Sequence, residues 1–145
     1  MKEMDQLAYG GIVMNDEGQV LMRSPSAFWG GYVWTFAKGS YESCDYSPDV
    51  TAIREVREET GYECEIVREI PGEFESDTCI TKYYLMKPTG TIYPYDKETQ
   101  EVKWFSIEEA LNMIKLTRSE KGRNRDTAAL LSALKTKEQL TDFKR

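Results

Sequence analysis

Apolar residues recur at every second position in several short stretches of the chain, a spacing that predicts β-strands. The first stretch runs from Leu7 to Asn15 and is followed by a turn at 16–18. We predict residues 19–23 as its partner in a β-hairpin. Further strands are expected at 33–36, 63–70, 78–87 and 101–105, with a loop at 88–95.

Residues 48–60 have the spacing of an amphipathic helix and clear signals at both ends. Ser47 is suited to the N-cap and Pro48 to the first helical position, where its missing N–H costs nothing. Gly61 accepts the left-handed conformation that ends many helices. On a wheel of 3.6 residues per turn, Ala52 and Val56 share the side that should face a core.

Two more helices are predicted near the end of the chain. Ser106 and Glu109 have the spacing of a capping box, in which each side chain bonds the backbone of the other. Residues 127–135 form the second helix, with leucines along one face. Strands, a helix, more strands and two helices together predict an α+β fold, in which a mixed sheet has helices on both sides.

The length of 145 residues and an apolar content of 40% fit a single globular domain over 1–145. The chain has no apolar run long enough for a membrane span and no signal peptide, so we expect a cytoplasmic protein that does not bind membranes. The net charge of −6 argues against general nucleic-acid binding. Histidine is absent, so catalysis must use carboxylates, Lys, Tyr, Cys or a metal.

The predicted helix at 48–60 carries three acids, Glu55, Glu58 and Glu59, on one face roughly opposite its apolar side. Like charges this close repel each other, and a divalent cation would reverse the sign of that interaction. Magnesium prefers oxygen ligands, so two or three carboxylates suit it, with manganese as a substitute. Arg54 lies one turn before Glu58 and can orient it through an ion pair. The alternative is a charged helix face in solvent, stabilised by Arg–Glu pairs.

The stretch Arg54-Glu55-Val56-Arg57-Glu58-Glu59-Thr60-Gly61-Tyr62, with Lys38-Gly39 upstream, resembles the signature of the Nudix hydrolases. That signature has a glycine, five residues, a glutamate, seven residues, and then the Arg-Glu segment. Here one extra residue separates the halves, and the first acid is Asp45 in place of glutamate.

The resemblance implies a Nudix-type α/β/α sandwich and magnesium-dependent hydrolysis of a phosphoanhydride in a nucleoside diphosphate linked to another moiety. It assigns Glu58 and Glu59 to the metal, and Glu55 either to a second ion or to the role of base. The family often adds a ligand before the last strand, for which Glu98 is preferred over Glu101. Arg54 completes the catalytic set.

We expect the substrate, a small phosphorylated nucleotide, to contact Lys38, Gly39, Arg23 and Trp29. For Trp29 the alternative is a cap on the sheet edge, and for Arg23 a purely structural role. Basic residues at 115–125 either clamp further phosphates or form a solvated loop. Dinucleoside polyphosphates and nucleoside triphosphates are the leading substrate classes, and the sequence leaves monomer and homodimer open.

Two rival functions remain at this stage. One is a nucleotide-binding or sensor module that keeps the Nudix fold with weak catalysis, which the displaced Asp45 would favour. The other is an interaction domain whose acidic helix binds a basic partner.

Overall fold

The structure is a computed structural model that describes residues 7–77 and 79–144, with side chains up to residue 140. A mixed sheet has the strand order β3-β1-β6-β4, with β5 added beside β6, and β2 and β7 pair in a second, two-stranded sheet. The strands are β1 (Leu7–Val13), β2 (Val20–Pro25), β3 (Lys38–Ser40), β4 (Tyr62–Glu69), β5 (Phe74–Glu75), β6 (Ile80–Ile92) and β7 (Thr99–Phe105).

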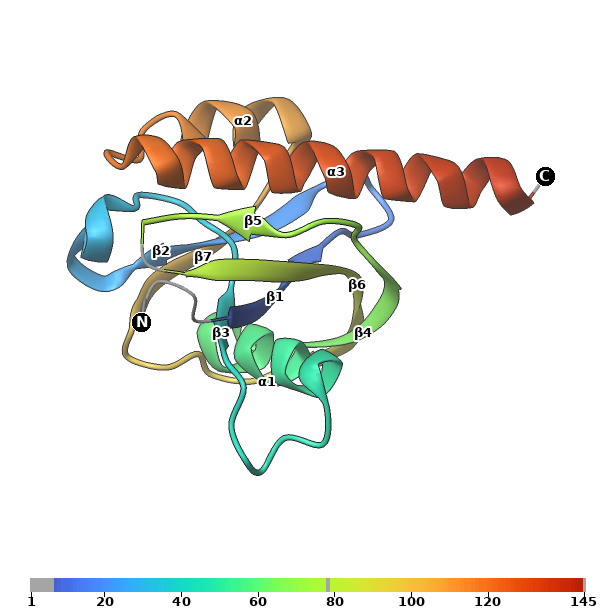
Figure 1. Cartoon of the computed structure of the whole chain (residues 1–145), viewed down its shortest axis with the longest axis horizontal. Helices are drawn as coiled ribbons and strands as arrows, with labels where there is room; N and C mark the ends of the chain where they lie inside the picture. The colour runs from blue at the N-terminus through green and yellow to red at the C-terminus, as the bar shows by residue number, and fades with distance from the viewer. Residues whose placement is uncertain (1–6, 78, 145) are drawn as a thin grey trace.

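Helices cover both sides of the strands, as Figure 1 shows, so the predicted three-layer α+β sandwich is confirmed. Helix α1 (Pro48–Thr60) lies on one side, and α2 (Ile107–Ile114) and α3 (Glu120–Lys144) lie on the other. None of the helices in the part of the chain described here is both long and apolar enough to cross a membrane.

Alternation along the central strands builds two cores. In β6, Tyr83 packs toward α2 and α3, whereas its neighbour Tyr84 packs toward α1, as the period of two requires. In β1, Ile12 likewise belongs to the core that contains Tyr83, and Val13 belongs to the core that contains Tyr84. The central strands are therefore buried on both faces, and α1 is held against the sheet through Ala52 and Val56.

The predicted hairpin between the first two strands is wrong. The turn forms, and the Asn15 amide donates to the Gln19 carbonyl at 3.1 Å, but β1 and β2 share only one bridge, between Met14 and Val20. Beyond it β1 pairs with β3 and β6, while β2 leaves for β7. Pairing of β1 with the distant strands β3 and β6 is favoured over pairing with β2 because it buries both faces of β1.

Three other boundaries differ from the predictions. In 33–36 only Thr35 is bridged, to Arg23, and the strand comes later, at Lys38–Ser40. The strand predicted from Thr78, which lies outside the described residues, continues through the predicted loop to Ile92. The last helix begins at Glu120 and not at residue 127.

Candidate active site

Helix α1 follows its local signals closely and presents its acids unequally. It runs from Pro48 to Thr60 and ends at Gly61 in the left-handed conformation (φ 84°). Ser47 has the extended backbone of an N-cap, although its hydroxyl donates to Asp49 and does not cap the helix. Glu55 and Glu59 are about nine-tenths buried, whereas the Glu58 side chain is 44% exposed. Two of the three acids are thus enclosed at the edge of the core.

Arg54 connects two of these acids, Glu55 and Glu58, to Asp45 in the loop before the helix. Its Nε and Nη2 donate to the two oxygens of Asp45 at 2.8 and 2.9 Å, a bidentate pair. Its Nη1 donates to both Glu55 and Glu58, at 3.2 Å each. The Arg54 guanidinium holds the pKa of Asp45 well below its usual range. Asp45 therefore reaches the helix despite the extra residue, which removes the feature that favoured a weakened sensor module.

Gly39 on β3 lies directly against the Glu55 carboxylate. A Cβ placed on Gly39 would overlap that carboxyl group, so any other residue would displace it. This close approach explains why a glycine is needed at this position. It also places β3 and the start of the acidic segment of α1 in direct contact.

Glu59 is the most buried of the three glutamates on α1 and lies between the Arg23 side chain and the backbone of Lys38. Its Oε1 accepts from the backbone N–H of Lys38 at 3.2 Å and lies 3.6 Å from Nε of Arg23. Burial raises the pKa of Glu59 to about 7, although Arg23 opposes the shift. Burial likewise raises the pKa of Glu55 to about 6, against the effect of Arg54. Both carboxylates therefore lack enough positive charge to offset their desolvation.

Arg23 connects this acid to the loop before β7. Its Nε donates to Oγ1 of Thr99 and its Nη2 to the Glu98 carbonyl, both at 2.8 Å. Because these two hydrogen bonds anchor Arg23 to the backbone and side chain of residues 98 and 99, its guanidinium is held in place beside Glu59. Glu98 itself is exposed at the rim.

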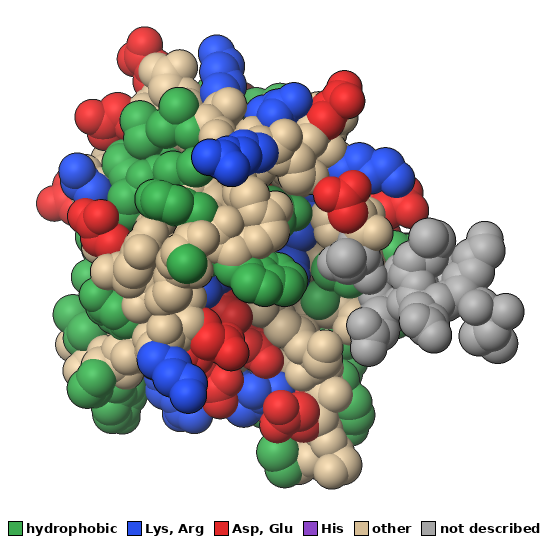
Figure 2. All heavy atoms as spheres, turned by 90° about the vertical axis from the view of Figure 1, so that its left-hand side faces the viewer, with side chains coloured by type: hydrophobic (Ala, Val, Ile, Leu, Met, Phe, Trp, Pro, Cys, Tyr) green, Lys and Arg blue, Asp and Glu red, His purple; other side chains and the backbone are tan. Residues whose placement is uncertain are grey.

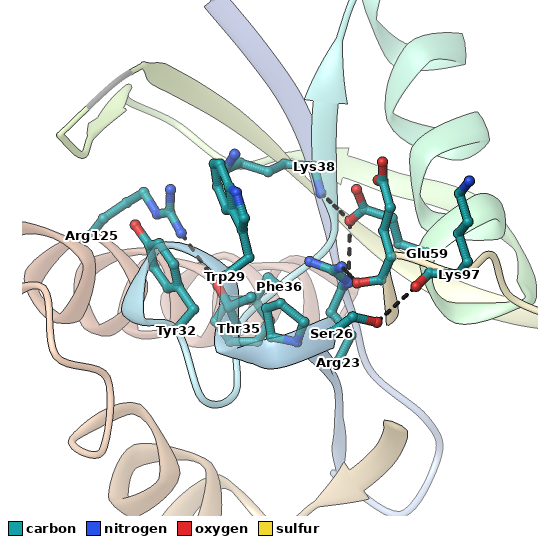
Figure 3. A pocket seen from close by; sticks show the side chains of 12 residues that line it. Arg23, Ser26, Trp29, Tyr32, Thr35, Phe36, Lys38, Glu59, Lys97 and Arg125 are labelled. Atoms are coloured by element: carbon teal, nitrogen blue, oxygen red, sulfur yellow. Dashed lines mark hydrogen bonds and ion pairs between the residues drawn. The ribbon is translucent and has the colours of Figure 1, made fainter. Parts of the chain in front are cut away.

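A cavity of about 600 Å³ opens beside Glu59, a size that suits a nucleotide. Figure 3 shows the side chains that line it, contributed by β2, the segment between β2 and β3, β3, α1, the loop before β7 and α3. The lining residues are Arg23, Pro25, Ser26, Trp29, Tyr32, Thr35, Phe36, Lys38, Glu59, Lys97, Glu98 and Arg125. On the surface, acidic side chains gather at the lower centre of the face in Figure 2, with Lys and Arg beside them and hydrophobic side chains above.

The cavity brings together five of the residues that the sequence singled out: Arg23, Trp29, Lys38, Glu59 and Glu98. Arg54, Glu55, Glu58 and Gly39 are joined to them through α1 and β3 but do not line the cavity. Among the residues that the structure describes, no three carboxylates converge closely enough to form a metal site by themselves.

Several lining residues were not predicted as site residues. Tyr32 belongs to a stretch expected to be a loop, and Thr35 and Phe36 belong to the strand predicted at 33–36, so nothing in their spacing marks them as part of a site. Among the described residues, Arg125 is the one member of the basic segment at 115–125 that lines the cavity, and it lies near the start of α3.

A three-layer fold with a buried carboxylate of raised pKa beside a cavity of this size has the features of a small-molecule active site. The family profile of the NUDIX domain matches residues 4–127, so the chain belongs to this family of hydrolases.

The solved structures to which this chain is similar share its fold but little of its sequence. The chain is similar to a Nudix hydrolase from Nitrosomonas europaea, with a TM-score of 0.72 and 15% identity over 88% of this chain and 87% of that one. An ADP-ribose pyrophosphatase from Streptococcus suis gives a TM-score of 0.67 and 20% identity, with 91% of each chain covered. Both likenesses are evidence for the fold alone.

A third relative is the m7GpppN-mRNA hydrolase dcap-2 of Caenorhabditis elegans, 29% identical over 107 residues. The match covers 70% of this chain, which spans about 14% of the length of that relative. The predictions of a Nudix family member, a Nudix fold and an enzyme class are confirmed.

Proposed function

We propose that this protein hydrolyses a phosphoanhydride bond in a nucleoside diphosphate linked to another moiety, with magnesium as cofactor. The observation that carries the proposal is Glu59, a buried carboxylate that lines a nucleotide-sized cavity between Arg23 and Lys38. The ADP-ribose pyrophosphatase and a UDP-X diphosphatase of the same fold act on compounds of this class, as their names state.

The carboxylates present have the donor chemistry of a hard divalent cation, for which waters and substrate phosphates would supply the ligands that the described residues do not. Glu55 and Glu59 are carboxylates that burial has made costly to ionise, and added positive charge would favour their ionised forms. Glu58 and Glu98, both partly or fully exposed, offer further oxygen donors near them. When bound, magnesium would neutralise phosphate oxygens and lower the pKa of a coordinated water.

The chain's own groups have distinct parts in this reaction. Glu59 and Glu58 would hold the cation, and Glu55 would either complete that set or accept a proton from the attacking water. Lys38 and Arg23 attract the phosphate oxygens, which matters in a protein whose net charge is −6. Arg54 keeps Glu55 and Glu58 in place by bonding both. Trp29, which is 73% exposed and lines the cavity, offers a ring for stacking.

A panel of nucleotides incubated with magnesium and analysed by product identity tests the proposal. The panel should include ADP-ribose, UDP-sugars, dinucleoside polyphosphates, nucleoside triphosphates and a capped RNA, the last because of the mRNA hydrolase relative. We expect two phosphorylated products from one of these compounds, and none when EDTA replaces magnesium. Binding of nucleotides without cleavage of any panel member would contradict the proposal.

A further inference from the structure

The end of the cavity away from Glu59 is built from residues that the proposed hydrolysis does not use. Figure 3 shows Tyr32, Thr35 and Arg125 grouped at one end, Glu59 at the other, and Trp29 between them. Arg125 comes from α3 and Glu59 from α1, so the two ends belong to opposite layers of the sandwich.

Arg125 is held rigidly at this end. It is 3% exposed, and its Nε donates to Oδ1 of Asp126 at 3.0 Å in an ion pair whose two side chains are almost fully buried. Its guanidinium lies 4.9 Å from the centroid of the Tyr32 ring, and its Nη2 donates to Oγ1 of Thr35 at 3.3 Å. A guanidinium tied down on three sides has a fixed direction toward the cavity.

Part of its donor capacity is unused. An arginine has five N–H donors, and within the described residues Arg125 commits only one from Nε and one from Nη2. Its Nη1 has no hydrogen-bond partner among these residues, yet Arg125 lines the cavity. The Thr35 hydroxyl, by contrast, has already used its donor, since it donates to Oδ2 of Asp126 at 2.7 Å. This end of the cavity therefore offers hydrogen-bond donors that a ligand can use.

The surrounding walls suit a flat ring. Pro25, Trp29, Tyr32 and Phe36 line the same cavity, and aromatic side chains stack readily on nucleobases. A purine fills such a slot better than a pyrimidine because it presents a larger ring surface. The ligand expected here is thus a planar heterocycle with hydrogen-bond acceptors on the edge that meets Arg125.

We propose that this end of the cavity recognises guanine, with Arg125 donating to its O6 and N7. Guanine presents these two acceptors side by side, and arginine matches them with a bidentate pair. Adenine presents a donor, its N6 amine, in place of O6, so it would face Arg125 donor to donor. The inference rests on the proposed function, because a nucleotide whose phosphates reach Glu59 must place its base farther along the cavity.

The test is the affinity of the metal-free wild-type protein for nucleoside monophosphates, measured by isothermal titration calorimetry. GMP, IMP and AMP carry the same ribose and phosphate, and IMP shares O6 and N7 with GMP. We expect GMP and IMP to bind at least about tenfold more tightly than AMP. The analogue 7-deaza-GMP, which lacks the N7 acceptor, should bind more weakly than GMP. Equal affinities for GMP and AMP, no loss with 7-deaza-GMP, or tighter binding of UMP or CMP would overturn the proposal.

Variants of α3 provide the second arm. Arg125→Met should abolish the preference for GMP over AMP, and Arg125→Lys, which keeps the charge but loses the planar fork, should reduce it. Lys135→Met is the matched control, since Lys135 is exposed farther along the same helix and does not line the cavity. If Arg125→Met does not fold, the comparison of GMP with 7-deaza-GMP on the wild type decides alone.

The two proposals fail separately. Preferential binding of GMP without cleavage of any nucleotide would remove the hydrolytic function and leave the guanine site. Cleavage of guanine and adenine nucleotides with equal binding would remove the guanine site and leave the hydrolytic function.

Discussion

The contact between Gly39 and Glu55 is a residue-scale feature that could be anticipated only in part. The Nudix-like spacing marked Gly39, and we assigned it to substrate binding. The structure gives it a steric reason, because a side chain there would occupy the place of the Glu55 carboxylate. The absence of a side chain at Gly39 therefore leaves room for the carboxylate of Glu55, 16 residues later in the sequence.

We expect Gly39→Ala to lower kcat by about tenfold or more while the protein remains folded. The new methyl group meets the end of a flexible side chain and not the backbone, so Glu55 moves and the core survives. Steady-state kinetics with thermal unfolding on the same samples measures both effects. Ser40→Ala, an exposed neighbour on β3, is the control and should leave the rate unchanged. A variant with wild-type kcat would show that the position of Glu55 does not matter.

Glu59 predicts a pH dependence of stability in metal-free protein. Its pKa in the folded state, about 7, lies above its ordinary value of 4.5, so the folded state binds the proton more tightly. The resulting stabilisation is full below about pH 4.5 and is lost as the pH rises through 7.

Between pH 5 and pH 8 in EDTA, we expect the wild type to lose about 2–3 kcal/mol of unfolding free energy relative to Glu59→Gln. Urea unfolding at each pH measures this difference. Glu55, with its pKa raised to about 6, titrates in the same range, but it is present in both proteins and its own contribution is subtracted in the comparison. The pKa of Asp45 is lowered, so its contribution changes only below this range. Parallel pH profiles for the two proteins would contradict the assigned environment of Glu59.

At the scale of elements, local signals were reliable and distant pairing was not. Helix α1 begins at Pro48 and ends at Thr60 as predicted, and the capping box at Ser106 forms with both of its hydrogen bonds, because these features depend on neighbouring residues. The partners of β1 depend on strands far along the chain, which the pattern of β1 does not encode. Register between strands therefore could not be derived from alternation alone.

Two misjudged elements have specific causes. A proline at position 88 argued for a loop, yet β6 continues because beyond Met86 it pairs only with β4, and a strand with one free edge tolerates proline. The first turns of α3 were missed because their inward side carries Gly122, Arg125 and Asp126 in place of apolar residues. A helix face that builds a polar cavity has no hydrophobic period to detect.

The segment that presents Trp29 is strained, which gives a prediction for the element. It is a short helical segment, η2 (Ser26–Gly31), in which Ala27 and Phe28 have left-handed conformations, at φ 57° and 52°. Such conformations cost about 1–2 kcal/mol for a residue with a Cβ and little for glycine.

Ala27→Gly should therefore raise the free energy of unfolding by about 0.5–1 kcal/mol, as measured by urea titration. Ala128→Gly, at an exposed position inside α3, is the matched control and should lower it by about 1 kcal/mol. The same sign for both variants would contradict a strained η2.

At the scale of the whole molecule, each layer of the sandwich contributes different side chains to the cavity. Helix α1 supplies Glu59 and α3 supplies Arg125, and the strands and loops between them supply the remaining walls. The acidic end could be predicted because its residues lie within one contiguous motif. The other end could not, since Tyr32 and Arg125 are 93 positions apart in the sequence and meet only in the folded chain.

The central claim is that Glu59 is part of the metal-dependent catalytic centre of a Nudix hydrolase. The most direct test is kcat of magnesium-dependent hydrolysis for Glu59→Gln, with the best substrate of the panel and with folding verified by thermal unfolding. Glu17→Gln is the matched control, an exposed acid in the turn at 16–18 that does not line the cavity. We predict a fall of about a thousandfold or more for Glu59→Gln and wild-type turnover for Glu17→Gln. A folded Glu59→Gln protein that keeps more than a tenth of the wild-type rate would contradict the account.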